Sequence, residues 1–314
     1  MLARHPAGLA SEKCDALRAG AVWDRAMHVV VSTPTPDELP FVVETLRTWQ
    51  DESAPLQLHP GDLGWSWRDG TSAVAAAVRT WTRDGMLVAV GFLDGPDALR
   101  MTVAPGLWRD DDVARHVVED VSDPGRGVLP EGAVAVEAPN ATRVFEVLGE
   151  AGWRVGEPWT PLRRDLAEPV DAAGLRVEVV EAGRSAQFTA VHRAVWGNDR
   201  FTDERWRAMA DGPAFARARC LLGRDSSGVA VAGVTVWSAG RGRPGLIEPM
   251  GVHPEHRGRG HGRAICLAAA AALREAGSSS ALVCTPAANE PAVAAYRSAG
   301  FVPEPVRLDR SRPA

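Results

Sequence analysis

Apolar residues recur along the chain with two alternating periods, that of an amphipathic helix and that of a strand. Apolar runs predict strands at residues 29–32, 86–93, 99–103, 133–137, 175–180, 217–224, 229–239, 245–252 and 281–285, with one more after Trp153. Helical spacing and start signals predict helices at residues 35–49, 71–82, 111–121, 185–196, 202–210 and 264–276, from Asn140 onward, and around Tyr296. The stretch 56–70 has no clear period, and its Trp65 and Trp67 are expected in the core, with pocket lining as the alternative.

The most distinctive segment joins the apolar run 245–252 to the helix at 264–276. It turns a corner at Pro254 and then alternates three glycines with three arginines, which are Gly258, Gly260, Gly262, Arg257, Arg259 and Arg263. Glycines let backbone N–H groups approach an anion, and a helix N-terminus adds donors and partial positive charge. The segment therefore predicts a phosphate cradle, with a glycine-rich turn carrying solvated arginines as the alternative. It matches neither the Walker A loop nor the Gly-x-Gly-x-x-Gly dinucleotide motif.

A second distinctive segment closes the chain. The strand predicted at 281–285 is followed by Asn289, Ala292, Tyr296 and the pair Gly300-Phe301 at regular spacing. The chain has 11 tryptophans but a single tyrosine, and that tyrosine lies in this segment. A core aromatic on an amphipathic helix is the other interpretation of Tyr296, and both can hold at once.

Together the two segments resemble the GNAT (Gcn5-related) N-acetyltransferases. The resemblance rests on Arg257-x-x-Gly260-x-Gly262 after a strand ending Val-x-Pro, and on the spacing from Asn289 to Phe301. It implies an α/β fold of the mixed type, with a central, mostly antiparallel twisted sheet flanked by helices. It also implies seven strands in each copy, a sheet splayed at its centre, and acetyl-CoA as cosubstrate.

The first half of the chain echoes the second at an offset of 254 − 105 = 149 residues. Met101, Val103 and Pro105 match Met250, Val252 and Pro254, and residues 133–153 mirror residues 281–301. A period of this length indicates two copies of one domain rather than a short solenoid repeat. We expect an N-terminal extension at 1–26, a first copy at 27–168, a linker at 166–173 and a catalytic copy at 174–314.

The first copy departs from the second where the chemistry is expected. Asp110, Asp111 and Asp112 replace the glycines and positive charge, and Leu148 stands opposite Tyr296. The aspartates suit a helix N-terminus as caps and would repel a diphosphate. The first copy is therefore expected to keep the fold without binding acetyl-CoA, and either supports the second copy or shapes the acceptor pocket between the two.

The resemblance assigns roles to residues of the second copy. Tyr296 is the expected general acid, and Glu248, a carboxylate in an apolar strand, is the candidate general base, with a salt-bridged surface residue as the alternative. Acetyl-CoA is expected to contact the strand, the loop and the last helix, at Met250, Gly251, Val252, Arg257, Gly258, Arg259, Gly260, His261, Gly262, Arg263 and Asn289. An N-cap role explains Asn289 equally well.

Composition and charge limit which classes of partner and which compartment are expected. The 314 residues carry a net charge of −5, which argues against a general nucleic-acid binder, and no apolar run approaches the length of a membrane span. Residues 1–26 lack the apolar core of a signal peptide, and the four cysteines show no paired spacing, so a cytoplasmic protein is expected. His253, His256 and His261 show no carboxylate–histidine ligand set, and no metal is expected.

The leading hypothesis is transfer of an acetyl group to a primary amine by direct attack in a ternary complex. The alternatives are an idle acyl-CoA-binding or sensing protein, and an acetyltransferase similar to mycothiol synthase. The acceptor, a small molecule or a peptide, is not specified by the sequence. Both a monomer with pseudo-dimeric domains and a homodimer fit.

Overall fold

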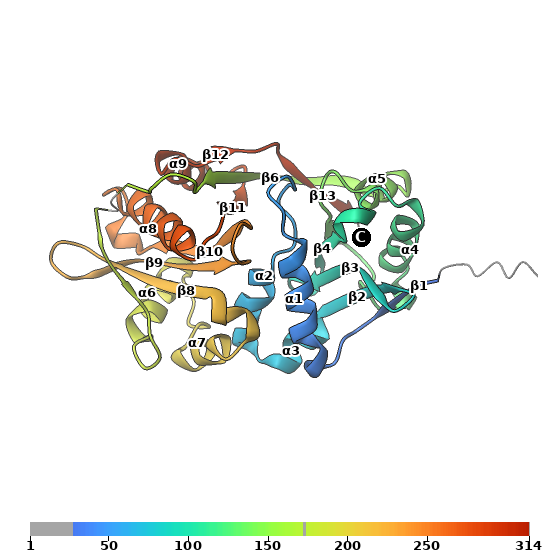
Figure 1. Ribbon diagram of the computed structural model, residues 1–314, viewed down its shortest axis with the longest axis horizontal. Helices are drawn as coiled ribbons and strands as arrows, with labels where there is room; N and C mark the ends of the chain where they lie inside the picture. The colour runs from blue at the N-terminus through green and yellow to red at the C-terminus, as the bar shows by residue number, and fades with distance from the viewer. Residues whose placement is uncertain (1–27, 172–173, 314) are drawn as a thin grey trace, which may run out of the picture.

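A computed structural model describes residues 28–171 and 174–313 of the chain. The expected N-terminal extension lies outside the described residues. Within the described ranges, no helix combines the length and apolar character that crossing a bilayer requires. Figure 1 shows an elongated molecule in which the two halves of the chain lie end to end.

The first half, residues 28–165, begins with a strand and ends with a long one. Its strands are β1 (Val29–Ser32), β2 (Val78–Arg83), β3 (Met86–Leu93), β4 (Ala98–Val103), β5 (Val134–Glu137) and β6 (Arg154–Asp165). Its helices are α1 (Leu39–Trp49), α2 (Pro60–Ser66), α3 (Thr71–Ala77), α4 (Asp111–Ser122) and α5 (Arg143–Glu150). The aspartates expected as caps do cap α4, where the Asp110 carboxylate accepts a hydrogen bond from the Val113 N–H at 2.9 Å.

The second half, residues 174–313, repeats this order with one helix fewer after its first strand and with one additional short strand, β12. Its strands are β7 (Arg176–Val179), β8 (Ala218–Arg224), β9 (Ala230–Ser238), β10 (Gly245–Val252), β11 (Ser280–Pro286), β12 (Val302–Pro303) and β13 (Arg307–Arg312). Its helices are α6 (Ala186–Trp196), α7 (Asp203–Ala210), α8 (His261–Glu275) and α9 (Glu290–Ser298). The strand–loop–helix unit β10–α8 thus corresponds to β4–α4, as the repeat predicts.

One prediction for the first half needs correction, and one stretch that had no assigned element contains a helix. The helix expected over 71–82 ends at Ala77, and Val78–Arg83 form β2, which pairs with both β1 and β3. Val78, Thr80 and Trp81 pack on the sheet there, so tertiary pairing overrides the local pattern. The unassigned stretch 56–70 contains α2, capped by His59, whose ring nitrogen accepts from the Gly61 N–H at 2.9 Å.

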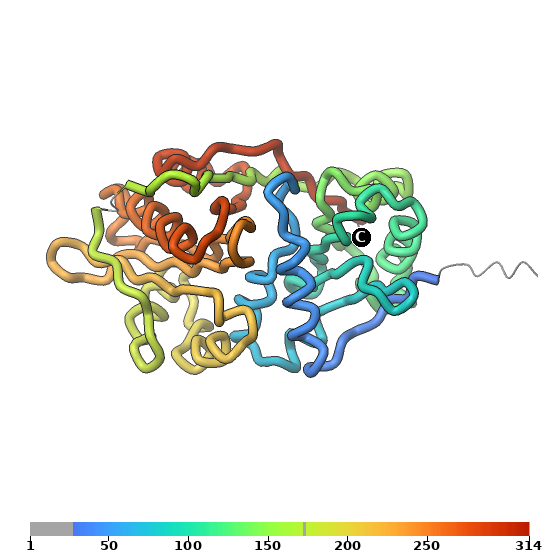
Figure 2. Tube along the Cα trace, in the orientation of Figure 1, coloured from blue at the N-terminus to red at the C-terminus, as the bar shows by residue number. Residues whose placement is uncertain are grey.

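All described strands belong to one sheet, in the order β1-β2-β3-β4-β5-β13-β6-β11-β10-β9-β8-β7, with β12 on β6. The two halves exchange their last strands. β6 of the first half pairs with β11 of the second, and β13 at the end of the chain pairs with β5 of the first. Figure 2 lets the reader follow both segments as they cross between the halves.

Each half contains one parallel pair of strands at its centre. In the second half, β10 and β11 pair only at Gly245–Ala281 and Leu246–Leu282. Beyond Leu246 the two strands diverge, and residues 247–252 pair with β9 alone. This splay is the one that the family resemblance implies, and it leaves the edge of β10 open toward α8 and α9.

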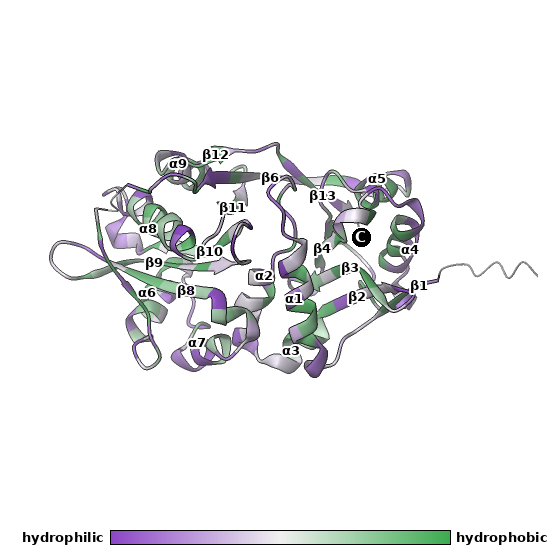
Figure 3. Ribbon diagram, in the orientation of Figure 1, coloured by the Kyte–Doolittle hydropathy of each residue, from purple (hydrophilic) through white to green (hydrophobic). Residues whose placement is uncertain are grey.

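The apolar core has three parts, and one of them joins the halves. Residues of β3, α4 and α5 form one cluster, and residues of β9, α8 and α9 form another. The third contains Leu39, Leu63 and Trp67 of the first half together with Phe188 and Trp237 of the second. Figure 3 shows apolar residues along β3, β8 and β9, whereas β6 and β13, between the halves, are mostly polar. Because this third cluster draws on both halves, the two are packed as one body.

Helix α2 lies directly on the second half because two of its residues are glycines. A Cβ added at Gly61 would lie 2.5 Å from the Trp237 ring, and one at Gly64 also 2.5 Å. Trp237 itself is buried, and its indole N–H donates to the Glu248 carbonyl at 2.6 Å. Helix α2 thus packs on Trp237, which is hydrogen-bonded to β10, the strand that carries several of the predicted site residues.

We expect Gly61→Val to lower the free energy of unfolding by about 1–3 kcal/mol, because the new methyl groups overlap Trp237. Thermal and denaturant melting would measure the loss. Gly106→Val is the matched control, since a Cβ there meets nothing within 4 Å. Equal stability of the two variants would contradict this packing.

Candidate functional site

A single cavity of ≈ 1390 Å³ opens where β10 and β11 diverge. It is lined by β10, the loop after it, the start of α8, the tip of β11, α9 and the α6–α7 region. Residues 65, 68 and 69 of the first half close its remaining side. Of the predicted site residues, all line this cavity except Arg259, which lies on the exposed side of the loop.

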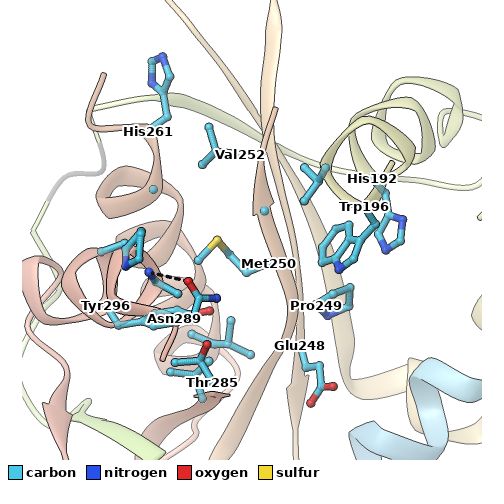
Figure 4. Close-up of a pocket in the computed structure, with 18 of the residues that line it drawn as sticks. His192, Trp196, Glu248, Pro249, Met250, Val252, His261, Thr285, Asn289 and Tyr296 are labelled. Carbon is cyan, nitrogen blue, oxygen red and sulfur yellow. Dashed lines mark hydrogen bonds between the residues drawn. The ribbon is translucent and has the colours of Figure 1, made fainter. Parts of the chain in front are cut away.

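Strand β10 presents the chain's predicted cofactor contacts to this cavity. Its pairing with β9 shifts register between Ile247 and Met250, a β-bulge that re-aims the side chains at the bulge. Figure 4 shows Met250 directed toward Tyr296 and Asn289, while Glu248 points away from them on the other side of the strand. Residues of β10 thus project from both sides of the strand toward the cavity.

The glycine loop, residues 257–263, has the left-handed backbone at two of its glycines. Gly258 and Gly260 have φ of 74° and 82°, in the left-handed region that favours glycine. The first helical bond of α8 runs from the Ala264 N–H to the Gly260 carbonyl at 3.1 Å. Within the described chain, the N–H groups of residues 258–263 donate to no backbone carbonyl. Six donors therefore gather at the N-terminus of a 15-residue helix.

The arginines of the loop carry positive charge without protein counter-ions. Arg257 donates from Nε to the Val252 carbonyl at 3.3 Å, and Arg263 donates to the Ser298 carbonyl at 2.9 Å. Among the described residues, neither they nor Arg259 lies within ion-pair distance of a carboxylate. Backbone donors, a helix N-terminus and uncompensated guanidiniums together fit a diphosphate.

Helix α9 carries Asn289 and Tyr296 to the opposite side of the splay. Asn289 caps the helix, its side-chain oxygen accepting from the Ala292 N–H at 3.4 Å, so the expected N-cap role is present alongside a place in the cavity. The Tyr296 ring is 6% exposed and packs edge-on against Phe301 at 5.9 Å. Burial raises the pKa of Tyr296 well above its usual range, so its hydroxyl keeps its proton at neutral pH.

Glu248 lies beside a network of charged side chains from the first half. Its Oε1 lies 3.5 Å from Nη1 of Arg100 on β4. Arg100 also contacts Asp62 at 2.9 Å, Asp94 at 2.8 Å and Glu137 at 3.4 Å. Burial raises the pKa of Asp62 to about 7, although Arg100 acts to lower it. Glu248 is therefore salt-bridged, as the alternative interpretation has it, and it also lines the cavity, so its role as general base stays a prediction.

Several residues that line the cavity were not predicted as site residues from the sequence. His192 and Trp196 lie one turn apart on α6, where apolar spacing is typical of a core-facing helix. Arg68 and Asp69 lie within the stretch 56–70, which has no clear period. Of the two tryptophans in that stretch, Trp67 is buried in the core as expected, whereas Trp65 packs on the core and lines the cavity.

The cysteines of the described residues have no reactive surroundings. Burial raises the pKa of Cys220 to about 11, of Cys266 to about 12 and of Cys284 to about 11. Cys284 lines the cavity, but a thiol this weakly acidic is a poor nucleophile at neutral pH. The structure therefore favours packing for Cys284.

One group of potential metal ligands does arise, contrary to the expectation that no carboxylate–histidine set exists. His253, Glu255 and His256 place ligand-type atoms within 4.8 Å of one another. His253 Nδ1 already accepts from the Glu255 N–H at 3.3 Å, so this turn is stabilised by its own residues.

Comparison with known proteins identifies the second half. The acetyltransferase (GNAT) family model matches residues 185–301. That range begins just before α6 and ends after α9, and so contains β10, the glycine loop and Tyr296. A search of curated protein sequences gives no match. The general activity of the family is acyl transfer, with acetyl-CoA as the usual donor and small molecules or peptides as acceptors.

Solved structures share the fold of the whole chain. A tandem GNAT protein from the clavulanic acid biosynthesis pathway superposes with a TM-score of 0.60 at 16% identity, covering 91% of this chain and 98% of its own. A GCN5-related N-acetyltransferase from Sphaerobacter thermophilus has a TM-score of 0.55 at 19% identity, covering 90% and 95%. A GNAT-family acetyltransferase from Colwellia psychrerythraea has a TM-score of 0.56 at 13% identity, covering 90% and 98%.

These likenesses at low identity establish the fold, and the family model adds the identity of the second half. The first half repeats the fold with three aspartates where the second has its glycine loop. Residues 185–301 are therefore an acetyltransferase domain of the GNAT family, set in a chain with the tandem GNAT fold whose first copy lacks the glycine loop.

Proposed function

We propose that this protein transfers the acetyl group of acetyl-CoA to a primary amine, using the second copy alone for cosubstrate binding. One observation carries the proposal. A single cavity joins the unpaired N–H donors of the loop, the open edge of β10 and the hydroxyl side of Tyr296. A diphosphate, a pantetheine arm and a thioester need such a row of sites in one continuous space.

The residues that would hold acetyl-CoA follow from this arrangement. N–H groups of residues 258–263, with Arg257 and Arg263, suit the diphosphate. Met250, Gly251 and Val252 on β10 suit the pantetheine arm, because their strand edge is free of β11. In the proposed complex, a backbone N–H on this edge stabilises the oxyanion that forms on the thioester carbonyl.

In the proposed reaction, the acceptor nitrogen forms a bond to the acetyl carbon while the carbon–sulfur bond breaks. Glu248 accepts the proton that the amine loses, and Tyr296 donates a proton to the departing thiolate. The network of Arg100 keeps Glu248 oriented from the first half. Both substrates are held together, so proximity supplies a large share of the rate.

The direct test is an assay of free thiol release from acetyl-CoA over a panel of primary amines, with mass spectrometry of the products. A mass increase of one acetyl group on an amine supports the proposal. Binding of acetyl-CoA without turnover over the whole panel would instead indicate the sensing protein.

A further prediction concerns Glu248. We expect Glu248→Gln to lower kcat/KM by about 10²-fold, because the amide cannot accept the amine's proton. Steady-state kinetics over the range of amine concentrations would measure the loss.

Arg100→Lys is the control for this prediction, since it keeps a positive charge beside the carboxylate and leaves Glu248 itself intact. That variant should lose much less of its kcat/KM than Glu248→Gln does. If Glu248→Gln keeps the wild-type kcat/KM, Glu248 acts only as an ion-pair partner.

A further inference from the structure

The end of the cavity beyond Glu248 has an aromatic wall that cosubstrate binding does not require. The wall consists of Trp65, His192, Trp196 and Phe201. His192 stacks on Trp196 with ring centres 4.1 Å apart and planes 21° apart, and Phe201 lies 4.6 Å from His192. Trp65, from the first half, lies 5.2 Å from His192 and 4.9 Å from Phe201. Figure 4 shows His192 and Trp196 across β10 from Tyr296 and Asn289.

His192 has no partner for its polar atoms. Both of its ring nitrogens are buried, and neither makes a hydrogen bond within the described chain. Burial, together with the nearby charges of Arg68 and Arg193, lowers the pKa of His192 to about 4. The ring is therefore neutral at physiological pH, with one donor and one acceptor nitrogen. With neither nitrogen exposed, or paired with a described residue, His192 contributes to the wall as a flat, neutral ring.

Trp196 is unusual for a residue of this wall because 43% of it is exposed. An exposed tryptophan beside a deep cavity offers a flat apolar face to a ligand. Flat rings stack well on such faces, because offset stacking and edge contacts suit the charge distribution of aromatic rings. The wall therefore selects for a planar group rather than for a branched aliphatic one.

The polar rim of this end carries an excess of positive charge. Arg68, Arg200 and Arg205 line the cavity there with two carboxylates, Asp69 and Glu248. Asp69 lies 3.6 Å from Arg68 and 3.1 Å from Arg205. The Arg68 guanidinium also covers the Trp65 ring at 4.3 Å, so this aromatic face is already occupied by a cation. A second cation is repelled at the rim, whereas an anionic group is attracted.

Glu248 faces the same space and lies close enough to Arg68 for their charges to interact. From these features we infer that the acceptor is a primary amine bearing a flat aromatic ring and an anionic group, as in an aromatic amino acid. The amine lies toward Glu248, the ring against the aromatic wall and the anion against Arg68 and Arg205. This inference rests on the proposed acetyl transfer, and it gives the first half a direct part in the acceptor site through Trp65 and Arg68.

The test compares tryptophan with two probes, each of which lacks one of the groups that the site is inferred to bind. Tryptophan has the ring, the amine and the carboxylate, tryptamine lacks the carboxylate, and cyclohexylalanine lacks the flat ring. We expect kcat/KM for tryptophan to exceed that for each of the other two by about tenfold, because each lost feature removes one contact of the site. Putrescine, a flexible dication, should be the poorest acceptor.

Variants then locate the contacts. Trp196→Ala and Trp65→Ala should each raise KM for tryptophan about tenfold and leave KM for cyclohexylalanine within about twofold. Arg68→Met should raise KM for tryptophan but leave tryptamine unaffected. Phe41→Ala is the matched control, because Phe41 is an exposed aromatic residue on α1 outside the cavity. Melting curves establish that each variant is folded.

Ligand-observed NMR of the full chain separates this inference from the proposed function. If no amine is acetylated, the proposed function fails, yet saturable binding of tryptophan that Trp196→Ala abolishes still supports the aromatic acceptor site. No binding of tryptophan overturns the inference. So does turnover with higher kcat/KM for putrescine or cyclohexylalanine, in which case acetyl transfer itself stands.

Discussion

Tyr296→Phe is expected to lower kcat by about 10²-fold, the usual contribution of a positioned general acid. The ring of Tyr296 fills the core beside Phe301, and phenylalanine keeps that ring, so the fold should persist. Only the hydroxyl is lost, and the departing thiolate then has no side-chain proton donor. Steady-state kinetics with saturating substrates would measure the effect, and calorimetry should find acetyl-CoA affinity unchanged.

Thr285→Val is the matched control, because it removes another buried hydroxyl of the same cavity at nearly constant volume. Its kcat should change little. The raised pKa of Tyr296 adds a second expectation about pH. The hydroxyl stays protonated below pH 10, so Tyr296 should cause no alkaline loss of kcat below that pH. Wild-type turnover in Tyr296→Phe would falsify the assignment of the acid.

Gly260→Asp is expected to weaken binding of acetyl-CoA by about 10²-fold, or roughly 2.7 kcal/mol. The substitution gives the loop an acidic residue of the kind that the first copy has at α4. It brings a carboxylate beside the diphosphate site, where two like charges repel by a few kcal/mol at the effective dielectric constant of a protein surface. Titration calorimetry with CoA would measure the loss, which should shrink as salt is added.

Strain has to be separated from charge in this variant, because Gly260 has a φ of 82° that side chains rarely adopt. Gly228→Asp is the control, since Gly228 has a φ of 87° in the turn between β8 and β9, and a Cβ there meets nothing within 4 Å. It should share the backbone strain and keep its affinity. Acetyl-pantetheine, which lacks the diphosphate, should bind the wild type and Gly260→Asp alike.

The exchange of β6 and β13 gives the first copy a structural role that does not depend on the acceptor. β6 pairs with β11 along residues 159–165, and β11 carries Cys284 and Thr285 into the cavity. β11, which has separated from β10 at the splay, is thus held on its other side by β6 of the first half. Because the sheet is continuous through β6 and β13, the halves fold around one set of hydrogen bonds.

The cosubstrate side of the site could be predicted because its signals are local. Gly258, Gly260 and the start of α8 lie within a few residues of one another, and left-handed glycines followed by a helix specify a set of N–H donors from sequence alone. The capping of α4 by Asp110 and the strand order within each hairpin are local in the same sense. The repeat at an offset of 149 residues then extended this interpretation to the first half.

The acceptor side depends on contacts between residues far apart in the chain, and the sequence contains no pattern for them. His192 and Trp196 have the spacing of an ordinary apolar helix face, and Trp65 lies in a stretch without periodicity. Only the packing of α2 on Trp237, which the two glycines of α2 allow, brings Trp65 and Arg68 to α6. The ion pair between Arg100 and Glu248 likewise joins residues 148 positions apart, because β4 and β10 belong to different copies.

The sequence by itself therefore determined the family, the repeated fold, the glycine loop and the sole tyrosine, since each rests on short-range spacing that the backbone must obey. Tertiary structure decided which strands the halves exchange and where the splay opens. It also decided which first-copy side chains reach the cavity. These outcomes follow from the packing of whole surfaces and from charge pairing in space, which short-range spacing does not encode.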